Sequence, residues 1–159
     1  MNTIIRDQFP ILREYQALRP MALDQLADTD LAFSPGGAAP SLAELCVGIG
    51  EVEHSYAASI ASRTIDFAYR NDDPARTGSV AALRDWYSEL DRQLQDAVAA
   101  LSDEDVAAWQ ITRFEGFTLP LQIHLDVYKE ALLLFYGRVD VYLTALGKTR
   151  PERWAEWLG

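Results

Sequence analysis

Gly-Arg-Val-Asp-Val-Tyr-Leu-Thr-Ala-Leu-Gly, residues 137–147, is the stretch that decides the fold of this chain. It closes a long segment in which apolar residues recur at helical spacing. Gly147 follows the last of these residues, which is the usual place for a glycine that ends a helix. We expect this helix to begin at a Thr118 cap, with Pro120 tolerated in its first turn.

Three further segments show the same helical periodicity, and none shows the sustained alternation of a half-buried strand. Pro20 lies inside the first segment and is expected to kink or split that helix. The second segment begins at Ser41, with Glu44 three residues later as a capping box. The predicted buried stripes are Ile11, Tyr15, Leu18, Ala22 and Leu26; Leu42, Leu45, Ile49, Val52, Tyr56 and Ile60; and Leu83, Tyr87, Leu90, Leu94, Ala97 and Leu101, with Trp86 at the margin. The predicted fold class is all-α.

A short internal repeat indicates how these helices are paired. Leu26, Asp28, Asp30, Leu31 and Ala32 recur as Leu101, Asp103, Asp105, Val106 and Ala107. Each copy follows one helix and precedes a glycine-containing loop, so the pattern predicts two similar hairpins joined by a long connector from about Thr64 to Gly78. Two such hairpins bury their apolar stripes by facing each other as a four-helix bundle. We expect residues 1–159 to form one domain.

Composition narrows the classes of partner. The 159 residues carry 14 basic and 24 acidic side chains, a formal net charge of −10. Such a chain repels phosphate backbones and anionic lipid, so neither nucleic acid nor a membrane is an expected partner. The single cysteine, Cys46, cannot form an internal disulfide, and no export leader or membrane-spanning run is evident. We therefore expect a cytoplasmic protein.

From about Leu23 to Pro151 the chain resembles the DinB/YfiT-like family of metal-dependent four-helix-bundle proteins. The resemblance rests on short motifs: Asp30-Leu31, Ser34-Pro35-Gly36-Gly37, Ser41-Leu42-Ala43-Glu44-Leu45, Glu53, and the ending from Gly137 to Gly147. It implies a bundle of that type, here with a short helical tail. Some members of the family are thiol S-transferases or isomerases that use low-molecular-weight thiols.

The histidines that the family uses to hold a divalent metal are missing from this sequence. The corresponding positions are Gly48, Ala131 and Phe135, and Arg138 replaces the glutamine that usually follows the late glycine. Glycine, alanine and phenylalanine side chains cannot coordinate a cation. We therefore expect no metal and no other cofactor, and we expect Phe135, with Tyr128 and Leu45, to fill the space that a metal would occupy.

The two histidines of the chain, His54 and His124, are the candidates for replacement ligands. His54 lies opposite the buried stripe of its helix, so we expect it to face solvent or a partner. The pattern Glu51-x-x-His54 matches one half of a carboxylate-bridged di-iron site, but the second half is absent because Leu121 precedes His124 by three residues. His124 shares a face with Tyr128 and is expected to point inward. It is either a hydrogen-bonded core residue or a general base or ligand.

Three other polar residues have two interpretations each. Cys46 is either a small buried residue or a nucleophile. Arg19 and Arg138 are expected to face inward, where a guanidinium needs either a structural carboxylate partner or a ligand anion. No phosphate-binding loop or nucleophile elbow is present.

The sequence thus predicts a family member that has lost its metal site and binds a small organic ligand or a partner in or on the bundle. The alternatives are a thiol S-transferase or related enzyme, and a protein interaction module. The candidate pocket residues are Gly48, His124, Tyr128, Phe135, Arg138 and Tyr142.

Self-association is a further expectation. Residues 131–136 are apolar on every side of their helix, and three bundle neighbours leave part of that circumference uncovered. The tail from Pro151 to Leu158, with Trp154 and Trp157, or a second subunit is needed as a cover. We expect a homodimer buried through the last long helix or its flanks.

Overall fold

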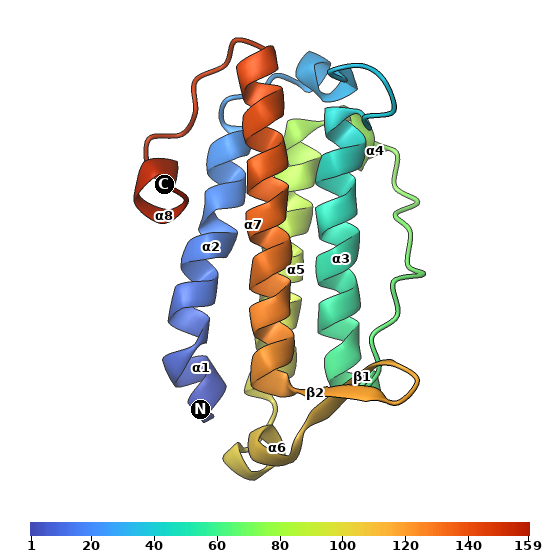
Figure 1. Ribbon diagram of the computed structural model, residues 1–159, viewed down its shortest axis with the longest axis vertical. Helices are drawn as coiled ribbons and strands as arrows, with labels where there is room; N and C mark the ends of the chain where they lie inside the picture. Colours follow the sequence, from blue (N-terminus) through green and yellow to red (C-terminus); the bar gives the residue numbers. More distant parts are fainter.

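The computed structural model describes residues 1–159, and four long helices form its body (Figure 1). These are α2 (Phe9–Leu23), α3 (Leu42–Ser62), α5 (Val80–Ala99) and α7 (Leu121–Ala145). The shorter elements are α1 (Thr3–Asp7), η1 (Asp28–Ala32), α4 (Ala75–Gly78), α6 (Asp103–Ala108), β1 (Gln110–Phe114), β2 (Phe117–Pro120) and α8 (Trp154–Trp157). The expected all-α four-helix bundle with a helical tail is confirmed.

The four helices do not simply alternate in direction. In Figure 1, α2 and α7 run upward, whereas α3 and α5 both run downward. Parallel neighbours need a connection as long as the helices themselves, and the 21 residues of α3 span about 31 Å. Residues 63–79 supply this connection as a mostly extended strap along the outside of α3 that ends in α4. The long connector predicted from Thr64 to Gly78 is therefore present and has a defined role.

Most predicted boundaries and stripes of the long helices are confirmed. The Ser41 hydroxyl accepts from the backbone N–H of Glu44 at 3.2 Å, and a Glu44 carboxylate oxygen accepts from the Ser41 N–H at 2.7 Å, so the capping box is complete. At the other end, Gly147 has a left-handed φ of 66° just after α7. On α5, Leu83, Tyr87 and Leu90 are buried as expected.

The predicted stripe of α2 is confirmed in part. Leu18 and Ala22 are buried and Arg19 faces inward, as expected, but Ile11 is 52% exposed and Gln16 faces the core. Apolar periodicity misses Gln16 because a polar side chain is acceptable inside the bundle only when it has a partner there, which for Gln16 is Glu53 on another helix. Pro20 is accommodated inside the last turn of α2 and does not split the helix.

The predicted start of α7 at Thr118 is wrong. Thr118 lies in β2, which pairs antiparallel with β1 through a turn at Gly116, where φ is 75°. The helix begins after Pro120. The strands have five and four residues and an irregular register, too short for an alternating pattern to be recognised. The hairpin lies across the lower ends of α3 and α7, where Thr64 bridges to Thr112.

The C-terminal tail packs against the bundle through its two tryptophans. Trp154 is fully buried, its indole N–H donates to the Leu18 carbonyl at 3.1 Å, and its ring lies 5.2 Å from that of Tyr136. Trp157 meets Tyr15 edge to face at 5.4 Å. The tail therefore covers one side of α7, which is one of the two covers that the sequence left open.

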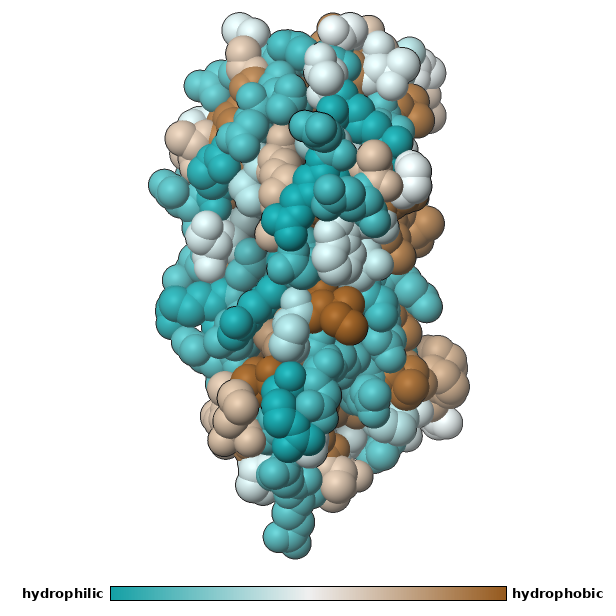
Figure 2. All heavy atoms as spheres, turned by 90° about the vertical axis from the view of Figure 1, so that its left-hand side faces the viewer, coloured by the Kyte–Doolittle hydropathy of each residue, from teal (hydrophilic) through white to brown (hydrophobic).

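No helix is long and apolar enough to cross a membrane. Figure 2 shows the side formed by α2 and α8, which is mainly hydrophilic with scattered hydrophobic residues.

Candidate functional site

A pocket of about 380 Å³ lies between the upper halves of α3 and α7. Its walls are mostly apolar and include Leu45, Ile49, Val52, Ala131, Leu134 and Phe135. Pro40, Glu44, Gly48 and Arg138 complete the lining. The pocket thus brings together, from two helices, the three positions at which the family resemblance places the missing histidines. These are Gly48, Ala131 and Phe135.

The space in front of Gly48 is open. A Cβ added to Gly48 would meet no heavy atom within 4 Å. Phe135 is nearly buried, at 5% exposure, yet its side chain forms a wall of the pocket. The expectation that Phe135, Tyr128 and Leu45 fill this space is therefore wrong. Tyr128 turns toward the core instead, and the volume between Gly48, Ala131 and Phe135 remains accessible.

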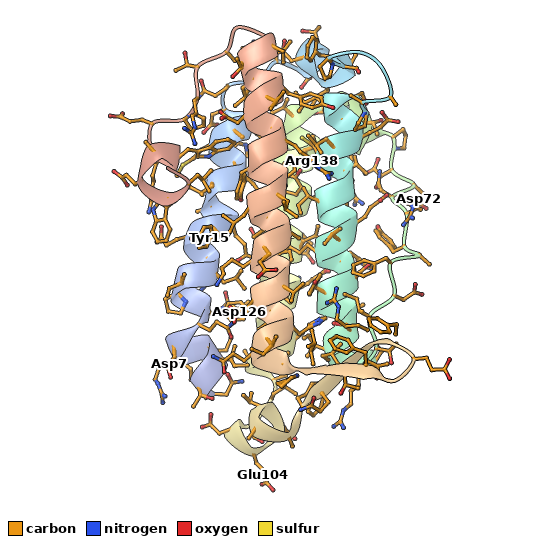
Figure 3. All side chains as sticks on the ribbon, viewed as in Figure 1. Asp7, Tyr15, Asp72, Glu104, Asp126 and Arg138 are labelled. Carbon is orange, nitrogen blue, oxygen red and sulfur yellow. The ribbon has the colours of Figure 1, made fainter.

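Glu44 and Arg138 are the charged residues of the pocket, and both are exposed at its upper end. Figure 3 shows Arg138 on the upper half of α7, on the side toward α3. The expected burial of Arg138 is wrong, because position 138 lies at the edge of the α3–α7 seam rather than in it. The two side chains form no ion pair with each other. Hydrogen bonds from Ser41 lower the pKa of Glu44, so its carboxylate is ionised at neutral pH.

His124 lies in a separate buried cluster at the lower end of the bundle. Its Nε2 is 2.9 Å from the Ser59 hydroxyl, and its Nδ1 is 3.4 Å from an Arg113 guanidinium nitrogen. Arg113 reaches the cluster from β1 and also donates to the Tyr56 hydroxyl at 3.1 Å. Burial, aided by the charge of Arg113, lowers the pKa of His124 to about 4. The predicted inward orientation is confirmed.

The direction of these hydrogen bonds limits what His124 can do. The Ser59 hydroxyl donates to the Tyr56 carbonyl at 2.6 Å, so its oxygen accepts from His124. Nε2 therefore carries the proton, and Nδ1 accepts from Arg113. A base that activates a serine needs the opposite direction. Ser59 and His124 form a structural contact, in agreement with the interpretation of His124 as a hydrogen-bonded core residue.

A charged network occupies the centre of the bundle. The Arg19 guanidinium contacts Glu53 of α3 and Asp91 of α5, and Gln16 donates to Glu53 at 2.8 Å. Arg19 and Glu53 are fully buried. Burial opposes the charge of Arg19, but Glu53 and Asp91 raise its pKa well above the usual value. The sequence left two possible partners for Arg19, a structural carboxylate or a ligand anion. The structure shows structural carboxylates, those of Glu53 and Asp91.

Tyr128 borders this network and not the pocket. Its hydroxyl is buried without a hydrogen-bond partner, and burial together with Glu53 raises its pKa. Tyr142 is also outside the pocket lining: its hydroxyl donates to the Pro40 carbonyl at 2.6 Å and ties α7 to the loop before α3. Of the six predicted pocket residues, Gly48, Phe135 and Arg138 come together, whereas His124, Tyr128 and Tyr142 are packed elsewhere.

The remaining candidates also have structural surroundings. Cys46 is buried, its burial raises its pKa to about 12, and it does not line the pocket. A thiol in that state is a poor nucleophile. His54 lies outside the core, as expected, and is half-buried because Tyr69 of the strap stacks on its ring, with the ring centroids 3.8 Å apart. Glu51, its neighbour in the di-iron pattern, accepts from the Asn71 backbone N–H at 2.8 Å and anchors the strap.

The donor set of the pocket does not fit a metal ion. Glu44 is the one lining residue with a side chain of the type that commonly binds metals, and one of its oxygens already accepts two hydrogen bonds from Ser41. A stable site needs three or four such donors. No group of three or more His, Cys, Asp or Glu side chains with suitable geometry occurs anywhere in the structure.

The strap between α3 and α5 and the helix order describe a four-helix bundle with one long crossover, and its candidate pocket lies between α3 and α7. A family model described as the DinB superfamily matches residues 12–123. The chain belongs to the DinB superfamily, which confirms the resemblance seen in its motifs.

Comparison with solved structures supports the same fold. The chain is similar to the crystal structure of a DinB-like protein, YjoA, from Bacillus subtilis, with a TM-score of 0.67 and 15% sequence identity. The superposition covers 86% of this chain and 89% of that protein. A search of curated proteins found no match.

Two features of the sites were missed from sequence for different reasons. Glu44 precedes Gly48 by one helical turn, so helical spacing already placed both on one face, but its role as a cap concealed its place at the pocket. Arg113 gave no usable signal, because it reaches His124 from a hairpin whose strands are too short to be recognised in the sequence.

Proposed function

We propose that this DinB-like chain binds a small organic molecule in the α3–α7 pocket without a metal at the family's usual position. The observation that carries the proposal is the open volume beside Gly48, bounded by Ala131 and Phe135. At about 380 Å³ it lies at the lower end of the range of ligand pockets, about 300–1,000 Å³, and it has the apolar walls and few polar groups typical of them.

The proposal is tested with a neutral, environment-sensitive probe such as N-phenyl-1-naphthylamine, whose fluorescence rises in apolar surroundings. We expect saturable binding to the wild type and a loss of at least tenfold in affinity for Gly48→Leu, because the new side chain enters the open volume.

Gly137→Leu is the matched control. It makes the same substitution on a long helix, also with open space around the new side chain, but Gly137 lines a different depression between α7 and the tail. Equal effects of the two substitutions, or no saturable binding by the wild type, would overturn the proposal.

We also propose that the chain forms a homodimer through α7. The tail covers the Tyr136 side of this helix, but Ile123, Leu134 and Val141 remain 45%, 68% and 59% exposed. Their spacings of eleven and seven residues place them along one side of the helix. A second copy can cover this stripe by two-fold pairing, the commonest closed arrangement.

A further inference from the structure

We infer that the ligand of the α3–α7 pocket is an apolar α-amino acid or a compound with the same zwitterionic head. The inference rests on the proposed pocket function and concerns the distribution of charge along the pocket. Glu44 lies in the first turn of α3, and Arg138 lies in the upper half of α7, so both charges are at the upper end. The apolar residues Ile49, Val52 and Ala131 lie farther down the α3–α7 seam, toward the lower end of the bundle.

The charged groups of Glu44 and Arg138, at the upper end of the pocket, are available to a ligand. Arg138 has no hydrogen bond or ion pair with another side chain, so its guanidinium can donate to a carboxylate. Glu44 uses one carboxylate oxygen, Oε2, to accept from the backbone N–H and the hydroxyl of Ser41, and Oε1 makes no hydrogen bond. That oxygen can accept from an ammonium group.

Two opposite charges favour a zwitterion over a simple ion. A monocarboxylate would contact Arg138 but would be repelled by Glu44, and a monoamine would experience the reverse. A head with a carboxylate and an ammonium on one carbon satisfies both, while its apolar side chain extends toward Ile49, Ala131 and Phe135. Because both protein charges are exposed, we expect each contact to change the affinity only about threefold to tenfold.

The test compares three ligands with the same phenyl group in competition with the neutral probe. L-Phenylalanine carries both charges, 3-phenylpropionate lacks the ammonium, and 2-phenylethylamine lacks the carboxylate. We expect L-phenylalanine to displace the probe about threefold to tenfold more effectively than either analogue.

Two substitutions assign the contacts. Arg138→Gln is expected to remove the advantage of L-phenylalanine over 2-phenylethylamine, and Glu44→Gln its advantage over 3-phenylpropionate. Glutamine can replace glutamate in a capping box, so Glu44→Gln is expected to fold. Arg13→Gln on α2 and Glu104→Gln on α6 make the same charge changes on exposed surface away from the pocket and serve as controls.

The outcomes separate the two proposals. Probe binding that Gly48→Leu abolishes, combined with equal displacement by all three ligands, would overturn the zwitterion inference and leave the pocket proposal standing. Preferences that persist in Arg138→Gln and Glu44→Gln would also overturn the inference. Failure of the probe to bind the wild type at all would instead overturn the pocket proposal, and the inference with it.

Discussion

The indole ring of Trp86 lies directly against the backbone of Gly50, so closely that a Cβ at Gly50 would come within 2.4 Å of the ring. The absence of a side chain at Gly50 therefore makes room for the Trp86 indole between α3 and α5. Gly48, two residues earlier on the same helix, faces open space. The same residue type serves close packing at one position and a pocket at the other.

This contrast predicts opposite effects of one substitution. Gly48→Ala is expected to stabilise the fold by about 0.5–1 kcal/mol, because alanine is the better helix former and meets no atom. Gly50→Ala is expected to destabilise it by about 1–3 kcal/mol, because the buried Trp86 ring must move away from the new methyl group. Urea denaturation of both variants is the measurement. Changes of the same sign would contradict this account of α3.

The convergence of Gly48, Ala131 and Phe135 on one pocket predicts how a metal site can be restored. We expect purified wild type to carry no stoichiometric divalent metal after dialysis without chelator. The triple variant Gly48→His, Ala131→His, Phe135→His is expected to bind about one zinc or nickel ion per chain, because imidazoles from all three positions then face the same volume. Elemental analysis and calorimetric titration test both statements.

Single histidine substitutions at the same positions are the controls, since one imidazole makes a much weaker site. About one metal ion per wild-type chain would show that the chain holds a metal with other residues. A folded triple variant without metal affinity would show that the three positions do not converge closely enough.

The extent to which sequence predicted this molecule depends on which interactions were local. The Ser41–Glu44 cap and the Gly147 stop involve residues a few positions apart, so spacing alone located them. Arg19 was expected to face inward, but its partner Glu53 lies on another helix, and no local pattern identifies that pairing. The inward turn of His124 followed from helical spacing, but its partner Arg113 depended on an unpredicted hairpin.

Half of the residues predicted for the candidate pocket do line it, and the difference again lies between local and long-range information. Gly48, Phe135 and Arg138 were found because short motifs placed them at family positions. Tyr128 and Tyr142 share the broad apolar face of α7, but the two sides of that face meet different neighbours: the central ionic network and the loop at Pro40. Helical spacing gives a face and cannot tell which neighbour covers each part of it.

The environment of His124 predicts a loss of stability in mild acid. Its pKa is lowered to about 4 in the folded chain, whereas an unfolded histidine titrates near 6.5. Between these values the unfolded chain binds a proton that the native chain does not, so stability falls as pH decreases from about 6.5 to about 4. We expect this histidine to account for a loss of about 1–2 kcal/mol between pH 7 and pH 5.

Denaturation of the wild type and of His124→Gln at both pH values measures this contribution. Glutamine can still donate to Ser59 but does not titrate, so the variant is expected to lose less stability in acid. An NMR titration that gives His124 a pKa near 6.5 would show that it is solvated and that its burial is wrongly described.

In the ionic network at the bundle centre, the buried charge of Glu53 is stabilised by Arg19, so removal of Arg19 is expected to lower the stability of the fold strongly. Arg19→Met is expected to destabilise the chain by about 3–5 kcal/mol, because it leaves the fully buried Glu53 carboxylate without its cation. The double variant Arg19→Met, Glu53→Leu is expected to recover much of this loss, since it removes both charges. Thermal and urea denaturation of the two single variants and the double variant form the cycle. Additive losses would show that the pair is not coupled.

The exposed stripe of α7 leads to the prediction of a homodimer. Leu134 also borders the pocket, so Val141 is the better position for testing the interface alone. We expect sedimentation velocity at tens of micromolar to give twice the 17.8 kDa mass of one chain for the wild type. Val141→Glu is expected to give the monomer mass, because two copies would place like charges in an apolar interface. Ile11→Glu, which alters an exposed apolar residue of similar accessibility on α2, is expected to leave the dimer intact. A wild-type monomer, or equal dissociation by both substitutions, would show that the α7 stripe is not the interface.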